Sequence, residues 1–285
     1  SLFITHIALV PESCAGQNKQ PADYVIRVKV EKDQSIRDIS KKMIELRQIT
    51  KKYAEYPALN ELNLMIPKGE LFGFIGPNGA GKTTTIKIIG GILAPTSGSV
   101  HVDGVSVQEF PEKAKSKMGY IPDRPYLYEK LTGMEFLRFT SQLYGVEDSL
   151  FQKKARQQLE MFSLEKWPDE LIESYSHGMK QRLIMASAFL HDPKIIIVDE
   201  PTVGLDPRGV KMIKDLFKTM TEQGVTIFMS THTLKVAEDI CDRIGVINRG
   251  KLIATGTVEE LMHMADTRGD LEEVFLTLTD EENGR

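Results

Sequence analysis

Runs of apolar residues that end in turn-forming residues recur along the chain and predict β-strands. Short apolar runs bounded by glycine, proline, asparagine or aspartate are typical of strands buried in a sheet. They predict strands at 44–49, 59–66, 71–75, 99–103, 117–121, 194–199, 225–231, 243–248 and 251–254.

Apolar residues at helical spacing occupy the stretches between several of these strands. They predict helices at 84–89, 133–144, 149–162, 183–190, 207–220 and 234–240. Pro207 suits the first turn of its helix, where its missing N–H costs nothing. Strands that alternate with helices indicate an α/β fold with a mainly parallel core sheet. The helical stretch at about 124–190 is interpreted as an inserted subdomain.

Residues 1–42 differ in pattern from the rest and are interpreted as an N-terminal extension of unknown role. The apolar run 2–10 and the alternation of apolar and charged residues at 24–30 each predict a strand. A loop is expected at 14–21 and a short helix at 35–43.

The main domain is expected at 43–260, followed at 261–285 by a short C-terminal helix and a frayed acidic tail. Lysine and arginine are dense at 27–52, which indicates a solvated face, with a membrane-surface role as a weaker alternative.

Composition narrows the class of protein. Hydrophobic residues make up 41% and charged residues 27%, as in ordinary globular proteins, and the net charge of −4 argues against a general nucleic-acid binder. Cys14 and Cys241 lie far apart and suggest structural thiols in a reducing cytosol. No apolar run approaches the roughly 18 residues of a membrane span, and the run 2–10 lacks the features of a signal peptide.

The strongest chemical signal lies between the predicted strand 71–75 and the helix-compatible run 84–89. It fits the phosphate-loop pattern G-x-x-x-x-G-K-[ST] with Gly76, Pro77, Asn78, Gly79, Ala80, Gly81, Lys82, Thr83 and Thr84. Glycines let backbone N–H groups surround phosphate oxygens, and the helix N-terminus adds positive charge. Lys82 is expected to reach the β- and γ-phosphates, and Thr83 to place its hydroxyl on Mg²⁺. A glycine-rich turn that binds nothing is the alternative.

Polar residues follow two further strands. Asp199 and Glu200 end an apolar strand, where Asp199 is expected to hold Mg²⁺ and Glu200 to accept a proton from an attacking water. His232 ends another strand and is a candidate catalytic residue. Ser176 is a good helix N-cap, and Gly178 leaves the backbone accessible behind it. Structural roles are the alternatives at each position.

From Ile44 onward the chain resembles the ATP-binding subunit of an ABC transporter. The resemblance rests on the order of an aromatic, the phosphate loop, a helical insert, the S-x-G signature, the run I-I-I-V-D-E-P-T, the G-L-D-P loop and a histidine. It implies a P-loop NTPase fold of ABC type, in which an antiparallel β subdomain and the helical insert accompany the core sheet. It also implies two ATP molecules bound between two such domains, with a homodimer expected.

The resemblance implies a role for each matching residue. The Lys82 loop of one subunit would meet Ser176 and Gly178 of the other. Tyr53 would stack on adenine and Asp206 would link the two sites. Glu200 would be the general base, with Lys82 and His232 contacting phosphate. ATP and Mg²⁺ are the expected cofactors.

Two positions depart from the family pattern. Asp123 stands where glutamine is usual, and its carboxylate is still a suitable Mg²⁺ ligand. In the signature, His177 replaces glycine and Met179 replaces glutamine. Both departures bear on the rate of turnover rather than on ATP binding.

The signature and the segment 270–279 resemble ATPases that drive drug, sodium or polysaccharide export, whereas importer ATPases often carry a longer C-terminal domain. The membrane partner would be a separate chain, contacted through 124–139, and the subunit would lie peripherally at the cytoplasmic face. Within that segment, exposed Tyr126 and Tyr128 suit interface anchors, unless they pack the insert. A non-transport ABC ATPase and a nucleotide switch without turnover are the alternatives.

Overall fold

The computed structural model describes residues 7–11, 24–28, 42–266 and 270–283, and the chain divides into two compact units, 1–41 and 42–285. In the first unit, β1 (Ile7–Pro11) pairs antiparallel with β2 (Tyr24–Val28). The predicted loop 14–21 and most of the predicted helix 35–43 lie outside the described residues. Lys42 and Met43, the last two residues of that predicted helix, instead open a strand of the second unit.

The second unit is built around a sheet with the strand order β12-β11-β5-β10-β9-β8 among the described residues. Its strands are β5 (Leu71–Ile75), β8 (Met118–Ile121), β9 (Ile195–Asp199), β10 (Thr226–Thr231), β11 (Arg243–Asn248) and β12 (Lys251–Gly256). All neighbours pair in parallel except β12, which is antiparallel to β11. Every residue of β5, β9 and β10 is buried, which explains why their apolar residues run consecutively without alternating with exposed polar ones.

A separate antiparallel sheet has the order β4-β3-β6-β7. It contains β3 (Lys42–Tyr53), β4 (Tyr56–Pro67), β6 (Ser97–Val102) and β7 (Val105–Ser106). Buried residues of this sheet and of the core sheet join those of helix α2 (Lys82–Ile89) in one hydrophobic cluster, with Ile44, Ile86 and Phe228 as examples. The strands β3 and β4 are longer than predicted because both continue past the apolar runs into their exposed connecting turn.

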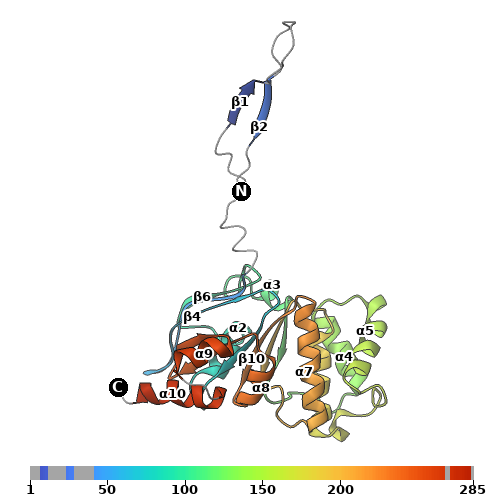
Figure 1. Ribbon diagram of the computed structural model, residues 1–285. Coiled ribbons are helices and arrows are strands. Elements are labelled where there is room, and N and C mark those ends of the chain that lie inside the picture. The colour runs from blue at the N-terminus through green and yellow to red at the C-terminus, as the bar shows by residue number, and fades with distance from the viewer. Residues whose placement is uncertain (1–6, 12–23, 29–41, 267–269, 284–285) are drawn as a thin grey trace. The chain divides into compact units, whose positions relative to one another are not determined.

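The helical insert lies between β8 and β9, and its helices α4 and α5 stand apart from the C-terminal helices in Figure 1. It comprises α4 (Gly133–Leu143), α5 (Asp148–Met161), a 3₁₀ turn (Ile172–Ser174) and α6 (His177–Phe189). Helix α6 begins six residues before the predicted apolar run 183–190, and its N-cap is Ser176, as predicted, whose Oγ accepts the Met179 N–H at 3.3 Å. Because residues 183–190 are all buried, no polar face marks this helix.

The segment before α6 is tied to the segment before α4. Ile172 N–H donates to Leu131 O at 2.9 Å, and Glu173 N–H donates to Glu129 O at 3.0 Å. The Glu129 carboxylate also pairs with Lys180 of α6 at 2.5 Å, and the contact lowers the pKa of Glu129. Backbone and side-chain contacts therefore join 129–131 to the start of α6.

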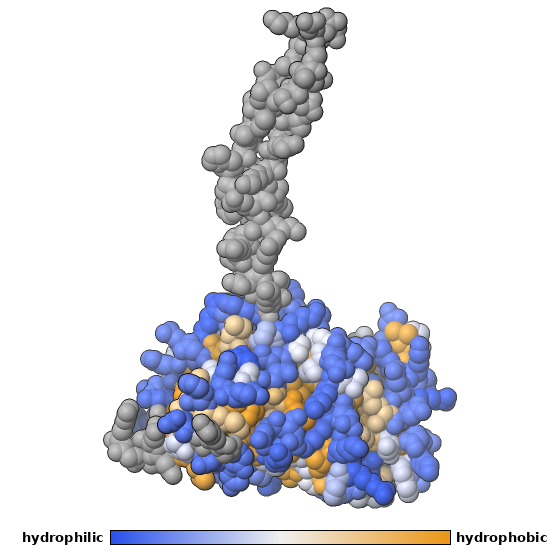
Figure 2. Space-filling model, in the orientation of Figure 1, coloured by the Kyte–Doolittle hydropathy of each residue, from blue (hydrophilic) through white to orange (hydrophobic). Residues whose placement is uncertain are grey.

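The remaining helices are α3 (Pro111–Lys115), α7 (Pro207–Glu222), α8 (Leu234–Ile240), α9 (Val258–Met264) and α10 (Leu271–Asn283). Neither α3 nor α9 was predicted as such, because helices this short show little periodicity. The C-terminal stretch contains two helices rather than one, and α10 runs to Asn283 where a frayed tail was expected. Within the described residues no helix is both long and apolar enough to cross a membrane. Figure 2 shows a mainly polar face with apolar patches.

Candidate nucleotide site

The phosphate loop connects the end of β5 to the start of α2, and its backbone passes close to neighbouring chain segments. A Cβ on Gly76 would lie 2.3 Å from the carbonyl oxygen of Ile247, and one on Gly81 would lie 2.8 Å from that of Ala58. Gly81 and Gly79 also have positive φ, 113° and 80°. Glycine is therefore required at 76 and 81 by space, and favoured at 79 and 81 by conformation.

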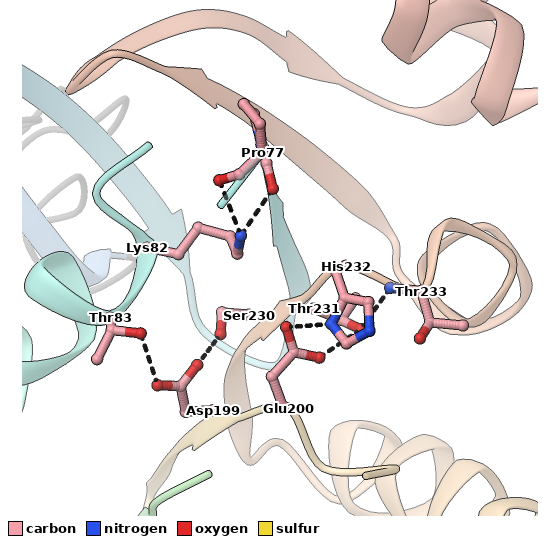
Figure 3. A network of polar contacts seen from close by, with 10 residues as sticks. Pro77, Lys82, Thr83, Asp199, Glu200, Ser230, Thr231, His232 and Thr233 are labelled. Atoms are coloured by element: carbon pink, nitrogen blue, oxygen red, sulfur yellow. Dashed lines mark hydrogen bonds and ion pairs between the residues drawn. The ribbon is translucent and has the colours of Figure 1, made fainter. Parts of the chain in front are cut away.

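Lys82 is 8% exposed and arches back over this loop (Figure 3). Its Nζ donates to the carbonyl oxygens of Gly76 at 2.7 Å and Pro77 at 3.2 Å. Burial lowers the pKa of Lys82, while Glu200 and Asp199 oppose that shift. The ammonium is thus held by two neutral carbonyl oxygens, and it can leave them for the negatively charged oxygens of a phosphate.

Asp199 joins the phosphate loop to the core sheet. Its Oδ2 accepts from Thr83 Oγ1 at 3.1 Å, and its Oδ1 accepts from Ser230 Oγ, the residue opposite it on β10 (Figure 3). A hydroxyl and a carboxylate side by side are the hard oxygen ligands that Mg²⁺ prefers, together with nucleotide phosphates. The residues present therefore fit the metal.

Glu200 follows β9 with a φ of 52°, an uncommon value for a residue with a side chain. Its N–H donates to Ser230 O at 3.0 Å, which fixes this turn. Its carboxylate accepts from Thr231 Oγ1 at 3.2 Å and lies 2.8 Å from His232 Nδ1 (Figure 3). The side chain is thereby oriented beside Asp199 at the sheet edge.

A cavity of about 560 Å³ opens at this edge. It brings together most of the predicted nucleotide and metal residues, namely Tyr53, Asn78, Gly79, Gly81, Lys82, Thr83, Thr84, Asp123, Asp199, Glu200 and His232. Tyr56, Ala58 and Val203 also line it and were not predicted. Tyr56 shares a turn with Tyr53 and is 62% exposed, so two tyrosines in one polar turn were the feature of the sequence that could have pointed to Tyr56 as a site residue.

The signature and Asp206 lie elsewhere. Ser176, Gly178 and Asp206 line a second cavity of about 760 Å³, which contains no phosphate-loop residue. Asp206 caps α7, where its Oδ1 accepts the Gly209 N–H at 2.8 Å. The predicted site residues are thus distributed over two cavities of one chain.

Residues 59–203 match a family model described as ABC transporter. The chain is 38% identical over 240 residues to the probable multidrug ABC transporter ATP-binding protein YbhF of Escherichia coli (strain K12), covering 83% of this chain and 41% of YbhF. It is 38% identical over 219 residues to the linearmycin resistance ATP-binding protein LnrL of Bacillus subtilis (strain 168), covering 77% of this chain and 70% of LnrL. The chain therefore spans less than half the length of YbhF.

Two solved structures share the fold. An ATP-binding subunit of an ABC transporter superposes with a TM-score of 0.79 and 32% identity, covering 83% of this chain and 99% of that one. A dimeric ATP-binding cassette in a post-hydrolysis state with ADP and Pi superposes with a TM-score of 0.70 and 30% identity, covering 75% of this chain and 98% of that one. These matches confirm the predicted α/β P-loop NTPase fold of ABC type. This chain belongs to the ABC transporter family and carries its ATP-binding ATPase domain.

Proposed function

We propose that this chain binds and hydrolyses ATP as one of two nucleotide-binding subunits, and that hydrolysis drives export through a separate transmembrane chain. The observation that carries the proposal is the placement of Glu200. Its carboxylate lies on the cavity that the phosphate loop lines, and Thr231 and His232 orient it. A carboxylate so placed is suited to accept the proton of an attacking water.

The phosphate end of ATP would occupy the loop 76–81, where backbone N–H groups and the start of α2 favour negative charge. Lys82 would exchange its carbonyl contacts for β- and γ-phosphate oxygens. Thr83 and Asp199 would hold Mg²⁺, with Asp123 at the cavity wall as a further oxygen ligand. When bound, Mg²⁺ neutralises phosphate charge. Tyr53, 49% exposed at the cavity rim, offers its ring face to adenine.

His232 contributes from the strand β10 side. It lies against the Glu200 carboxylate while its side chain is 60% exposed, so its other ring nitrogen is available toward the γ-phosphate. Glu200 and His232 together would then position water and phosphate. The main contributions are orientation and electrostatic stabilisation rather than covalent chemistry.

The second cavity supports a site shared between two copies. Ser176 and Gly178 stand at the N-terminus of the thirteen-residue helix α6, whose dipole suits a γ-phosphate. They lie away from the chain's own phosphate loop, so a second copy would bring its loop to them. The dimeric cassette among the similar structures supports this arrangement. Asp206, in the same cavity, would link the two sites.

The helical insert carries the surface proposed for the transmembrane chain. Tyr126 and Tyr128 are 79% and 61% exposed, and Tyr128 packs edge-on against Phe139 with ring centroids 5.4 Å apart. Exposed aromatics held by a neighbour are suitable anchors for a partner. The direction of transport follows the similar proteins, one named for multidrug transport and one for linearmycin resistance. The subunit would then be peripheral, at the cytoplasmic face.

The proposal is tested by phosphate release from the purified chain with Mg²⁺ and ATP. The variant Glu200→Gln keeps the shape of the side chain but loses its basicity, so we expect turnover to fall by about 10²- to 10⁴-fold while ATP and a dimer accumulate. Glu222→Gln, at the exposed end of α7, is the matched control and should hydrolyse like the parent. A parent that releases no phosphate would indicate a nucleotide switch, and undiminished hydrolysis by Glu200→Gln would exclude Glu200 as the base.

A further inference from the structure

His177, the first residue of α6, lies against the loop that follows Glu200. A Cβ placed on Gly204 would lie 2.3 Å from His177 Cδ2 and 2.6 Å from His177 Nε2. The imidazole therefore occupies the space that any side chain at 204 would need. Gly204 also has a φ of 77°, a conformation that favours glycine.

The loop 200–206 connects the two cavities. Its first part lines the first cavity with Glu200 and Val203, and the Val203 N–H donates to Glu200 O at 3.2 Å. It enters the second cavity at Gly204 and ends at Asp206, the N-cap of α7. His177 contacts this loop at Gly204, between Glu200 and Asp206. The contact joins the start of α6 to the loop within one chain.

Gly178 approaches the same point from α6. An ideal Cβ on Gly178 would lie 3.5 Å from Gly204 O and 4.0 Å from Leu205 Cδ2, so its backbone packs on the loop without a side chain of its own. His177 therefore supplies the side chain of this contact. Without the ring, Gly204 would lose its closest side-chain neighbour and, as a glycine, would gain much conformational freedom.

We propose that His177 is a positioning residue that holds the loop 200–206 against α6, so that Ser176, Gly178 and Asp206 meet a second copy as one preformed surface. The inference rests on the proposed sharing of each ATP site between two copies. It gives a role to the departure from the family's glycine at 177. Its energetic basis is pre-organisation, because a loop that is ordered before association loses less entropy when the dimer forms.

Its magnitude follows from the number of residues released. Because ordering the backbone of one residue opposes association, releasing Gly204 corresponds to dimerisation weaker by on the order of tenfold. The side chain at 177 is exposed, so its replacement should leave the fold intact. ATP binding to the monomer should also be unchanged, because the phosphate loop lies in the other cavity.

The test uses the full chain in a Glu200→Gln background, with dimerisation measured by analytical ultracentrifugation against ATP concentration. We expect His177→Gly to weaken dimerisation about tenfold, and His177→Phe, which keeps a flat ring against Gly204, to restore it. Gly204→Ala should also weaken dimerisation, because its methyl group would collide with the His177 ring. In a His177→Gly background the same Gly204→Ala change should weaken dimerisation less, since the ring is then absent. Equal dimerisation of His177→Gly and the parent, or failure of His177→Phe to rescue, would overturn the proposal.

Hydrogen exchange on the monomer separates this inference from the proposed function. Amides 203–206 should exchange faster in His177→Gly than in the parent and in His177→Phe. If the Glu200→Gln parent does not dimerise with ATP, the shared site is wrong, and the positioning of a dimer surface falls with it. If the parent dimerises but exchange at 203–206 is the same in all three proteins, the shared site stands and the role of His177 is refuted.

Discussion

Removing the hydroxyl of Ser230 should destabilise the fold through Asp199. Ser230 is fully buried, Asp199 is 4% exposed, and Ser230 Oγ donates to Asp199 Oδ1. In Ser230→Ala that oxygen of a buried carboxylate loses its donor, and among the described residues the Thr83 contact at the other oxygen is the hydrogen bond that remains. A hydrogen bond to a charged group contributes about 1.5–3 kcal/mol to stability. In a unit of this size, at about 2 °C per kcal/mol, the melting temperature should fall by about 3–6 °C.

The assay is thermal unfolding of nucleotide-free parent and variant at neutral pH. Ser187→Ala is the matched control, because it removes the same atoms from a buried serine whose Oγ donates to the neutral Ile184 carbonyl at 2.7 Å within its own helix. Alanine favours that helix, so its melting temperature should move by less than about 1 °C. Equal shifts in the two variants would refute the argument from the buried charge. Ser230→Ala should also need more Mg²⁺ than the parent for half-maximal hydrolysis, since Asp199 is less firmly oriented in it.

Two further predictions concern other parts of the unit. Burial lowers the pKa of His191, whose ring stacks on Tyr144 with centroids 3.8 Å apart. As the pH falls, the imidazole therefore binds a proton in the unfolded chain before it does in the folded one. The folded state thus loses stability as the pH falls below about 6.5, the ordinary pKa of histidine. His191→Phe, which keeps the stack, should lose less stability than the parent between pH 7.5 and 5.5 in thermal melts. Replacing Tyr126 and Tyr128 together by alanine should abolish pull-down of the proposed transmembrane chain, with ATP binding intact.

Each of these has its own check. For His191, equal losses of melting temperature in parent and variant on acidification would show that this histidine is not responsible. For the two tyrosines, Phe110→Ala is the control, since Phe110 is 57% exposed but lies outside the helical insert. Unchanged pull-down by the tyrosine variant would remove the insert surface from consideration as the docking site.

The phosphate loop could be predicted from sequence because its chemistry is local. Gly76 to Thr84 are consecutive, the strand before them is observed as predicted, and the helix predicted at 84–89 is observed from Lys82. Asp199 and Glu200 could be predicted for the same reason, because they directly follow a continuous apolar run. That the structure gathers these residues at one sheet edge follows from parallel pairing, while their individual roles stay predictions.

The rest depended on contacts between distant segments. Ser230 faces Asp199 only because β9 and β10 are paired in register, and no spacing in the sequence reveals that partner. At α6 the N-cap Ser176 was predicted correctly, whereas the apolar pattern marked only residues 183–190, because the first turns of the helix carry small and polar residues. His177 was noticed as a departure from a pattern, but its packing on Gly204 requires the fold that brings α6 beside the loop 200–206.

The contacts that join 129–131 to the start of α6 have a mechanical consequence. Two backbone hydrogen bonds and the Glu129–Lys180 ion pair link the segment that follows Tyr126 and Tyr128 to the residues on both sides of the signature. If the proposed transmembrane chain binds Tyr126 and Tyr128, these contacts would pass a displacement of that surface on toward Ser176. The insert would act as a lever, with force applied at one end and an ATP-facing helix terminus displaced at the other.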